Sequence, residues 1–439
     1  MCPVAINRRD LGRAVVLAWL TGNSKEAWCM SSAPWRADFP VLDQSINGYP
    51  LTYLDSAATT HRPRDVLAAM NAFYEHTNAN PGSALHTLAR RAHEHYEKAR
   101  NTVARFLNAP SPDEIVWTKG TTEGINLVAT AWARSLLQRD DEILLTTAEH
   151  ASNLLPWRLV AEQTGARVSY VDIDDEGRIL ADDLHRKLSD RTRLFAFSHV
   201  SNVVGYVNPA KLLCATARAA GARVLIDAAQ SAPHVAIDVQ DLGCDFLVFS
   251  GHKILGPMGS GVLWARRALL ETMPPYQAGS NMAHEVDTSS QQFEPAARKF
   301  GAGTPNVAGA VGLAAAIEYS HKLRRAAIER HEVELTRYAL ERLKEVSGLR
   351  LLGPKTLTGR VPVFSFVLGQ HAPDLILRHL DSRGIAVRAG DLAAVPLLKR
   401  FGVPAAVRAS CYLYNQAADI DRLVMALQEL TRLRAKGRA

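Results

Sequence analysis

Cysteine is scarce in this chain of 439 residues, which contains only five. The five are Cys2, Cys29, Cys214, Cys244 and Cys411, and no two of them have the CxxC spacing. Such an odd and scattered set argues against a disulfide scaffold and against a zinc site. We therefore expect a reducing, cytoplasmic compartment and no bound metal.

Long apolar runs are also missing. No run of about 18 apolar residues occurs, so the sequence predicts no membrane span. The segment GRAVVLAWLTG near the start is apolar but short, and no small-residue cleavage site follows it. We interpret residues 1–30 as a flexible extension or the result of an upstream start codon, with Met30 as an alternative first residue. A weak export signal is the other interpretation.

A basic patch of the kind that binds nucleic acid is lacking too, although the formal net charge is +7. Much of this charge sits near the two ends of the chain, at Arg8, Arg9, Arg13, Arg432, Arg434, Lys436 and Arg438. No basic helix is interleaved with aromatic residues, so we do not expect nucleic-acid binding.

The central part of the chain alternates short apolar strands with helical segments. Strands are predicted at residues 114–118, 142–147, 167–173, 193–200, 223–229, 246–250 and 261–265. Helices between them include residues 121–137 and 209–221, the second ended by a glycine suited to the position after a helix. This alternation predicts an α/β fold with a mostly parallel, seven-stranded sheet covered on both faces.

The pattern changes in the last third of the chain. A long helix is predicted near 307–330, then a strand of alternating polarity at 361–368 and an amphipathic C-terminal helix. The apolar residues of that last helix are Ile420, Leu423, Val424, Leu427 and Leu430. We predict a large domain at 45–310 and a smaller α+β domain made of 31–44 with 311–439.

Polar residues follow several of the predicted strands, where ligands bind in open α/β sheets. They are Thr121, Thr122, His150, Asn202, Asp227, Gln230, Ser250, His252 and Lys253. Glycine followed by hydroxyls at a helix start suits a phosphate, and an acid after a buried strand needs a polar partner. Each residue alone is as often structural.

At successive strand ends, however, these residues fit one cofactor, pyridoxal 5′-phosphate. Lys253 would form an imine with its aldehyde, and Asp227 would keep its ring nitrogen protonated so that the ring accepts electrons.

Seven motifs carry a family resemblance: YLDSAATT, KGTTEGINLVA, EHASNLLPW, SHVSNVVG, IDAAQSAPH, FSGHKILGPMGSGVLW and GTPN. They resemble the cysteine desulfurases of the SufS/CsdA group, in the class V aminotransferase branch of fold-type I pyridoxal-phosphate enzymes. The resemblance spans roughly residues 35–430, in order and with few gaps. It implies a fold-type I transferase, a homodimer and a role in sulfur metabolism.

The resemblance also implies roles for the matching residues. Lys253 is the Schiff-base lysine, Asp227 pairs with the pyridine nitrogen, and His150 stacks on the ring and shuttles protons. The implied cofactor contacts are Thr121, Thr122, His150, Asn202, Asp227, Gln230, Ser250, His252, Lys253 and Thr304.

The implied substrate contacts lie in the last part of the chain, apart from Asn202. Arg408 clamps the α-carboxylate of the substrate through a bidentate bond, and Arg388 falls in a matching element. Thr304 reaches the phosphate of the neighbouring subunit, which is why the resemblance implies a dimer.

Two loops depart from the family pattern. Where the family has a setting such as RTGHHCA, this chain reads RAGDLAA, so Ala393 occupies the position of the persulfide-forming cysteine. A methyl group cannot attack sulfur, because the nucleophile must be a thiolate. Before HT, the residues from Pro81 to Ala84 replace the family's His-Arg-Gly stretch. Rescue by Cys411 is disfavoured, because we expect its side chain to be buried packing.

We therefore predict a C–S lyase of the cysteine desulfurase family that acts on cysteine, selenocysteine or a cysteine derivative, without the persulfide relay. Transfer of sulfur to an acceptor protein is the step that the missing thiol calls into question. The alternative is a class V aminotransferase or epimerase. A non-enzymatic cofactor-binding partner of a sulfur-handling assembly is disfavoured by the intact Lys253, His150, Asp227 and Arg408.

Overall fold

A computed structural model describes residues 33–83 and 85–435 of the chain. The predicted extension at residues 1–30, with its possible export signal, lies outside the described residues. Among the helices that are described, none is long and apolar enough to cross a membrane.

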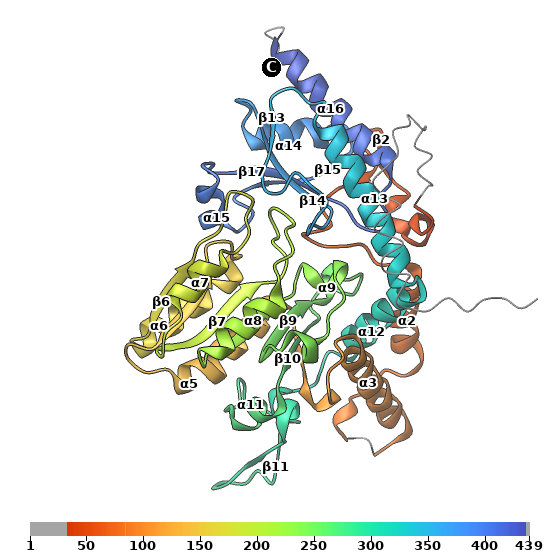
Figure 1. The fold of residues 1–439 in the computed structure, drawn as a ribbon. Coiled ribbons are helices and arrows are strands. Elements are labelled where there is room, and N and C mark those ends of the chain that lie inside the picture. Colours follow the sequence, from red (N-terminus) through yellow and green to blue (C-terminus); the bar gives the residue numbers. More distant parts are fainter. Residues whose placement is uncertain (1–32, 84, 436–439) are drawn as a thin grey trace, which may run out of the picture. The chain divides into compact units, whose positions relative to one another are not determined.

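The largest sheet has seven strands, as predicted, and lies in the centre of Figure 1. In spatial order the strands are β4 (Ile115–Thr118), β10 (Gly261–Ala265), β9 (Phe246–Ser250), β8 (Arg223–Asp227), β7 (Thr192–Ser198), β5 (Glu142–Thr146) and β6 (Arg167–Val171). Within this sheet β10 pairs antiparallel with both neighbours, and the remaining pairs are parallel. The mostly parallel sheet is therefore confirmed, and the carboxyl ends of β4, β5, β7, β8 and β9 share one edge.

Both faces of this sheet are buried. Along β7, Phe195 and Phe197 pack into one apolar core, whereas Leu194 and Ala196 pack into the core on the other side. This explains why the central strands are apolar throughout rather than alternating. The first face is covered by α3 (Thr87–Phe106), α7 (Ala181–Lys187), α8 (Ala210–Ala219), α10 (Val239–Leu242) and α12 (Val307–Lys322). The second is covered by α4 (Thr121–Leu127), α6 (Leu155–Thr164) and α11 (Arg267–Thr272).

The helix predicted at residues 121–137 is a continuous run with an irregular middle. After α4 comes a π-helix, η5 (Val128–Ala133), and then α5 (Arg134–Leu136). A π-helical turn inside a helix is rare and shifts the register of the side chains that follow it.

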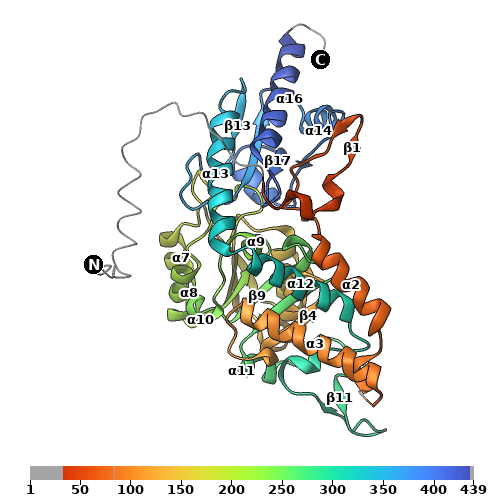
Figure 2. The same cartoon turned by 90° about the vertical axis from the view of Figure 1, so that its right-hand side faces the viewer.

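The helix predicted near 307–330 is wrong in its extent. α12 ends at Lys322, and a second helix, α13 (Arg325–Leu343), begins after Arg324, which has a φ of +62°. A left-handed residue cannot continue a right-handed helix, so the chain changes direction there. Figure 2 shows α13 leading away from the group formed by α12, α2 (Arg64–His76) and α3, against which α12 packs.

The last third of the chain forms a smaller antiparallel sheet, shown in blue in Figure 1. Its strands, in spatial order, are β13 (Leu349–Leu351), β14 (Val363–Leu368), β17 (Ala406–Ser410) and β16 (Arg388–Gly390). Helices α14 (Pro373–Asp381) and α16 (Ala417–Ala435) pack against each other beside it, and α15 (Val395–Arg400) follows β16. The predicted domain boundaries stay predictions.

Three short strand pairs and one short helix complete the framework. Strand β3 (Thr52–Tyr53) pairs in parallel with β15 (Ile385–Ala386), which ties the start of the described chain to its last third. The other pairs are β1 (Ser45–Ile46) with β2 (Tyr49–Pro50) and β11 (Ala283–His284) with β12 (Gln292–Phe293), and α9 (Ser231–His234) follows β8.

Candidate active site

A cavity of about 500 Å³ opens at the carboxyl edge of the seven-stranded sheet, where strands β16 and β17 face it. It gathers nearly all of the residues predicted for the site: Thr121, Thr122, His150, Asn202, Asp227, Gln230, Ser250, His252, Lys253, Arg388 and Arg408. The predicted residue outside it is Thr304, which is exposed and accepts a hydrogen bond from Asn80 at 3.3 Å. Strand ends from distant parts of the sequence therefore converge, as the sheet topology requires.

Lys253 and Asp227 lie on neighbouring strand ends. Lys253 follows β9 in a single 3₁₀ turn, and burial lowers its pKa to about 8 despite the opposing effect of Asp227. Asp227 ends β8, and burial raises its pKa although Oδ1 accepts the Ala229 N–H at 2.8 Å. Within the described residues no side chain or backbone group is hydrogen-bonded to Lys253 Nζ. An amine that is partly neutral and unengaged is suited to covalent chemistry with an aldehyde.

His150 stands in the loop after β5 and is neutral. Burial lowers its pKa to about 4, and the nearby charges of Lys253 and Arg408 act in the same direction. Nδ1 of His150 accepts the Ser152 N–H at 3.1 Å, which places its proton on Nε2. A neutral imidazole in this place can stack on an aromatic ring or accept a proton.

A group of hydroxyls surrounds the start of α4. Ser250 Oγ accepts the backbone N–H of Thr121 at 2.8 Å and lies 2.8 Å from Thr121 Oγ1. Thr122 Oγ1 lies 2.8 Å from Ser152 Oγ, and His252 Nδ1 is buried without a hydrogen-bond partner in the described chain. These donors fit a phosphate group, because phosphates bind where helix starts and hydroxyls present free hydrogens.

Glycines keep this corner tight. A Cβ on Gly120 would lie 3.1 Å from Ser250 Oγ, and a Cβ on Gly261 would lie 2.4 Å from Gly120 Cα. Glycine at 261 is therefore required by the close approach of the Gly120 backbone, and Gly120 itself has a φ of +157°, which side-chain-bearing residues rarely adopt.

Two arginines of the smaller sheet face the cavity beside one carboxylate. Asp55 accepts hydrogen bonds from Arg408 Nη2 at 3.2 Å and from Arg388 Nη2 at 2.8 Å. Arg408 Nη1 also donates to the backbone oxygen of Asn202, while its buried Nε has no partner among the described residues. Two positive charges against one negative charge leave one positive charge for the carboxylate of a ligand.

Asp55 was not singled out from the sequence, although a signal for it exists. It follows the apolar stretch of LTYLD directly, which is the same pattern that identified Asp227. The pairing of β3 with β15 brings Asp55 to the arginines, and that pairing is not visible in the sequence.

Glu149 is a second residue that the sequence did not assign. Its carboxylate is fully buried and accepts hydrogen bonds from Thr146 Oγ1, Asn153 Nδ2 and the N–H and Oγ of Ser198, at 2.5–3.1 Å. Burial nevertheless raises its pKa to about 7. Ser198 lines the cavity, so Glu149 supports the cavity wall from behind.

The loop that departs from the family pattern is fixed against the sheet edge. Asn202 Nδ2 donates to the Leu392 oxygen at 2.9 Å, and the Ala151 N–H donates to the Ala393 oxygen at 2.7 Å. Both Leu392 and Ala393 have a φ of +53°, a conformation that costs about 1–3 kcal/mol per residue and persists only where its surroundings impose it. Ala393 lines the cavity, as its alignment with the family's cysteine predicts.

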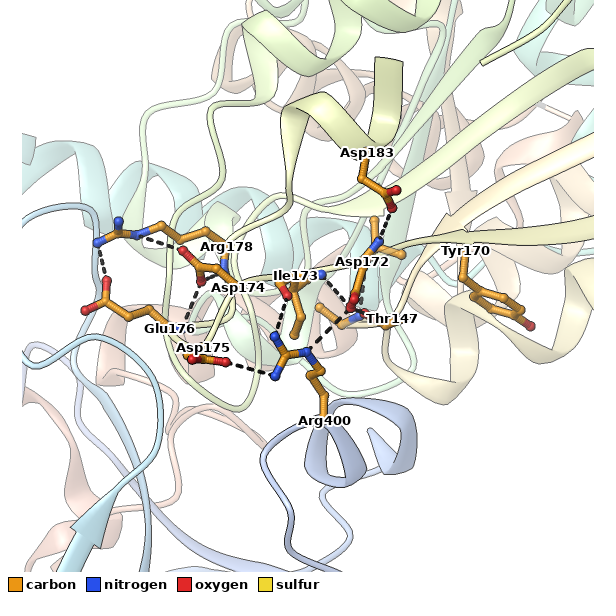
Figure 3. Close-up of polar contacts among 12 residues, drawn as sticks. Thr147, Tyr170, Asp172, Ile173, Asp174, Asp175, Glu176, Arg178, Asp183 and Arg400 are labelled. Carbon is orange, nitrogen blue, oxygen red and sulfur yellow. Dashed lines mark hydrogen bonds and ion pairs between the residues drawn. The ribbon is translucent and has the colours of Figure 1, made fainter. Parts of the chain in front are cut away.

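Arg400, at the end of α15, anchors the segment after this loop (Figure 3). It donates to Asp175 Oδ1 at 2.9 Å and to the backbone oxygen of Ile173 at 3.1 Å, and its Nε lies 3.6 Å from Asp172 Oδ1. All three partners belong to the segment between β6 and α7, on the seven-stranded sheet. The loop is thus held from both sides.

None of the three cysteines in the described part of the chain lines this cavity. Cys214, Cys244 and Cys411 are all buried, and burial raises the pKa of each thiol. Such thiols are poorly nucleophilic, because the thiolate is the reactive form. Cys411 accordingly lies inside the packing of the last third of the chain, as expected.

Sequence comparison identifies the family. The chain matches the aminotransferase class-V family over residues 52–423. It is 45% identical to a probable cysteine desulfurase of Streptomyces coelicolor, over 90% of this chain and 96% of the relative. It is 44% identical to a cysteine desulfurase of Salmonella typhimurium, over 91% of this chain and 98% of the relative.

Solved structures agree with this result. The cysteine desulfurase CsdA of Escherichia coli, in an S-sulfonic acid form, is 38% identical and superposes with a TM-score of 0.84, covering 91% of this chain and 98% of that one. The apo cysteine desulfurase of Thermococcus onnurineus is 35% identical with a TM-score of 0.86, over 91% and 97% of the two chains. The chain therefore belongs to the aminotransferase class-V family and, within it, to the cysteine desulfurase-type, fold-type I enzymes that use pyridoxal 5′-phosphate on a small amino-acid substrate.

Proposed function

We propose that this protein cleaves the Cβ–S or Cβ–Se bond of cysteine, selenocysteine or a cysteine derivative without forming a persulfide on its own chain. The observation that carries the proposal is Ala393, which lines a cavity otherwise equipped for this chemistry. The three cysteines at 214, 244 and 411 are buried away from that cavity, so they offer no thiol in its place.

Pyridoxal phosphate, when bound, withdraws electrons from the Cα of an attached amino acid and so makes its Cα proton acidic. Lys253 would carry the cofactor covalently, and Thr121, Thr122, Ser250 and His252 would hold its phosphate. The buried carboxylate of Asp227 would hold a proton on the ring nitrogen, because an anion in a dry site attracts a neighbouring positive charge strongly.

The substrate would be oriented by its carboxylate. The one positive charge left by Arg408, Arg388 and Asp55 would bind the α-carboxylate, which directs the Cα hydrogen toward the Lys253 amine. Once the substrate amino group has replaced Lys253 on the cofactor, the freed Lys253 amine would take that proton, and a pKa of about 8 allows a useful fraction of free amine near neutral pH. The neutral His150 would stack on the ring and pass a proton.

The departing sulfur needs only a proton. The electron pair of the Cβ–S bond leaves with sulfur, which becomes a thiol, and water then releases pyruvate and ammonia. In total, an S-substituted cysteine and one water give pyruvate, ammonium and the thiol, with no oxidant, reductant or protein thiol consumed. This balance is why a site without the family's cysteine can still complete a reaction.

The test is a screen of the cofactor-loaded protein against cysteine, selenocysteine, cysteine sulfinate and S-substituted cysteines. Alanine, pyruvate, and released sulfur or selenium are measured together. We expect cleavage of the carbon–sulfur or carbon–selenium bond of at least one substrate, without protein-bound persulfide in the mass spectrum. Racemised substrate, or pyridoxamine phosphate with a keto acid, would instead favour the epimerase or aminotransferase alternative.

The absence of a relay is tested separately with two cysteine variants. Cys411→Ala should keep full turnover, since this thiol is buried. Ala393→Cys should begin to accumulate persulfide if the missing thiol alone blocks the relay. Loss of turnover in Cys411→Ala together with a persulfide on Cys411 in the parent protein would overturn the proposal.

We also propose a homodimer, in which Thr304 contacts the cofactor phosphate of the neighbouring subunit. Support comes from its exposed position outside the cavity of its own chain. Light scattering tests the dimer, and a Thr304→Ala variant should bind the cofactor less tightly. A cytoplasmic location belongs to the same proposal, and the missing thiol at Ala393 calls transfer of sulfur to an acceptor protein into question.

A further inference from the structure

The outer wall of the cavity carries one carboxylate that the proposed chemistry does not use. Asp391 follows β16 and lines the cavity together with Ala393 and His150. It lies close enough to His150 to oppose the burial that lowers the pKa of that imidazole. The cysteine desulfurase motif has a histidine here, so the charge on this wall differs from that of the family pattern.

The place of this carboxylate is fixed by its loop. Asp391 Oδ1 accepts the Ala393 N–H at 3.0 Å, and the next two residues are held to the sheet edge through Asn202 and Ala151. Only one of its two oxygens takes part in that bond, so the other is available to a ligand.

Among the carboxylates that line the cavity or face its arginines, Asp391 is the one without an assigned partner. Asp227 is assigned to the cofactor ring, and the two arginines with Asp55 leave one positive charge for the substrate α-carboxylate. His150 is neutral. No lysine or arginine of the described chain lies within ion-pair distance of Asp391. A ligand in this cavity therefore meets a carboxylate on this wall that no cation of the described chain neutralises.

We propose that Asp391 selects the leaving group: the preferred substrate is a cysteine whose sulfur carries a group ending in an ammonium or another N–H donor. The alanine at 393 in place of a larger thiol leaves room for such a group beside Cβ. This inference rests on the proposed C–S cleavage and names its substrate class. It also predicts that anionic leaving groups, cysteine sulfinate among them, are disfavoured.

Three S-substituted L-cysteines of similar size separate charge from shape. S-(2-aminoethyl)-cysteine carries a cation, S-propyl-cysteine is its neutral counterpart, and S-carboxymethyl-cysteine carries an anion. We expect kcat/KM to fall in that order, by up to about fivefold at each step, because Asp391 is exposed and an exposed ion pair contributes about 1 kcal/mol or less. The preference should shrink as salt is added, because screening weakens exposed charge pairs.

The matched variants are Asp391→Asn and Asp190→Asn. The first keeps an oxygen to accept the Ala393 N–H but removes the charge, so it should make the three substrates nearly equal. The second changes an exposed aspartate just before the start of β7, whereas the cavity lies at the carboxyl end of that strand, so it should leave the preference intact. Dissociation constants on cofactor-loaded Lys253→Ala, measured by calorimetry, give the same comparison without turnover.

Equal binding and equal kcat/KM for the three compounds in the parent protein would overturn the inference, as would a preference that survives Asp391→Asn. Turnover of cysteine alone, with no binding of the S-substituted compounds, would leave the proposed C–S cleavage standing and reject the leaving-group class. If no amino acid reacts, the proposed function fails. The order of the three dissociation constants measured by calorimetry then still decides whether Asp391 selects the group on sulfur.

Discussion

The active-site cavity has two walls that differ in how closely they follow the family pattern. The first wall is formed by the strand ends of the seven-stranded sheet and is called the sheet wall here. It keeps every group expected there: Thr121, Thr122, His150, Asn202, Asp227, Gln230, Ser250, His252 and Lys253. The wall formed by residues 388–394, called the loop wall here, keeps Arg388 and Gly390. It replaces the threonine, the two histidines and the cysteine of the family setting with Ala389, Asp391, Leu392 and Ala393. In the proposed function, therefore, the wall that would seat the cofactor follows the family pattern, and the wall that would face the leaving group departs from it.

Among the substitutions in the sheet wall, Lys253→Ala should have the largest effect. The variant should lose the visible absorption band of the covalently bound cofactor and at least about 10³-fold of turnover, since in the proposed function one group both carries the cofactor and moves the Cα proton. Lys299→Ala is the matched control, because this buried lysine bonds backbone oxygens of residues 271 and 273 outside the cavity. A visible band that persists in Lys253→Ala would place the attachment elsewhere.

Arg408→Ala tests the point where the two walls meet. Removing it leaves Asp55 paired with Arg388 alone, so no net positive charge remains for the α-carboxylate. A desolvated charge pair is worth about 2–5 kcal/mol, which corresponds to a rise in KM of at least about 30-fold. Arg408→Lys should restore part of the loss, since it keeps the charge without the two-pronged geometry. An unchanged KM in both variants would remove Arg408 from substrate binding.

The sheet wall was predictable from the sequence because its rule is local. A buried parallel strand must end, and the polar residues that follow it must lie at the shared carboxyl edge. Asp227, His150 and Lys253 were each found in this way, and the sheet topology then brought them together.

Other parts were not predictable, because they depend on contacts between segments far apart in the chain. Asp55 reaches the arginines through the pairing of β3 with β15, more than three hundred residues away. The end of α12 depends on one left-handed residue, Arg324, which no sequence signal marks. Ala393 was located only by its match to a family motif, and its position against Ala151 comes from the fold.

The pH dependence of cofactor attachment sharpens the account of the sheet wall. Only the neutral Lys253 amine can attack the aldehyde, and with a pKa of about 8 roughly one tenth of it is neutral at pH 7. The rate at which the visible band appears after mixing apo protein with cofactor should rise about tenfold per pH unit below 8 and then level off. A lysine model compound measured alongside corrects for titration of the cofactor itself. A rate that still climbs steeply above pH 9 would mean an ordinary lysine.

Arg400→Gln probes the loop wall and should have the smallest effect. The variant loses the ion pairs with Asp172 and Asp175, and Asp175 is 92% exposed, so about 1 kcal/mol or less is at stake. The loop would still be held by Asn202 and by the Ala151 N–H, so substrate affinity should fall less than about fivefold. Asn202→Ala, which removes a direct bond to the loop, should weaken binding more. If Arg400→Gln proved the more damaging of the two, the position of the loop would depend on the anchor at α15 rather than on the sheet edge, and the two walls would not be independent.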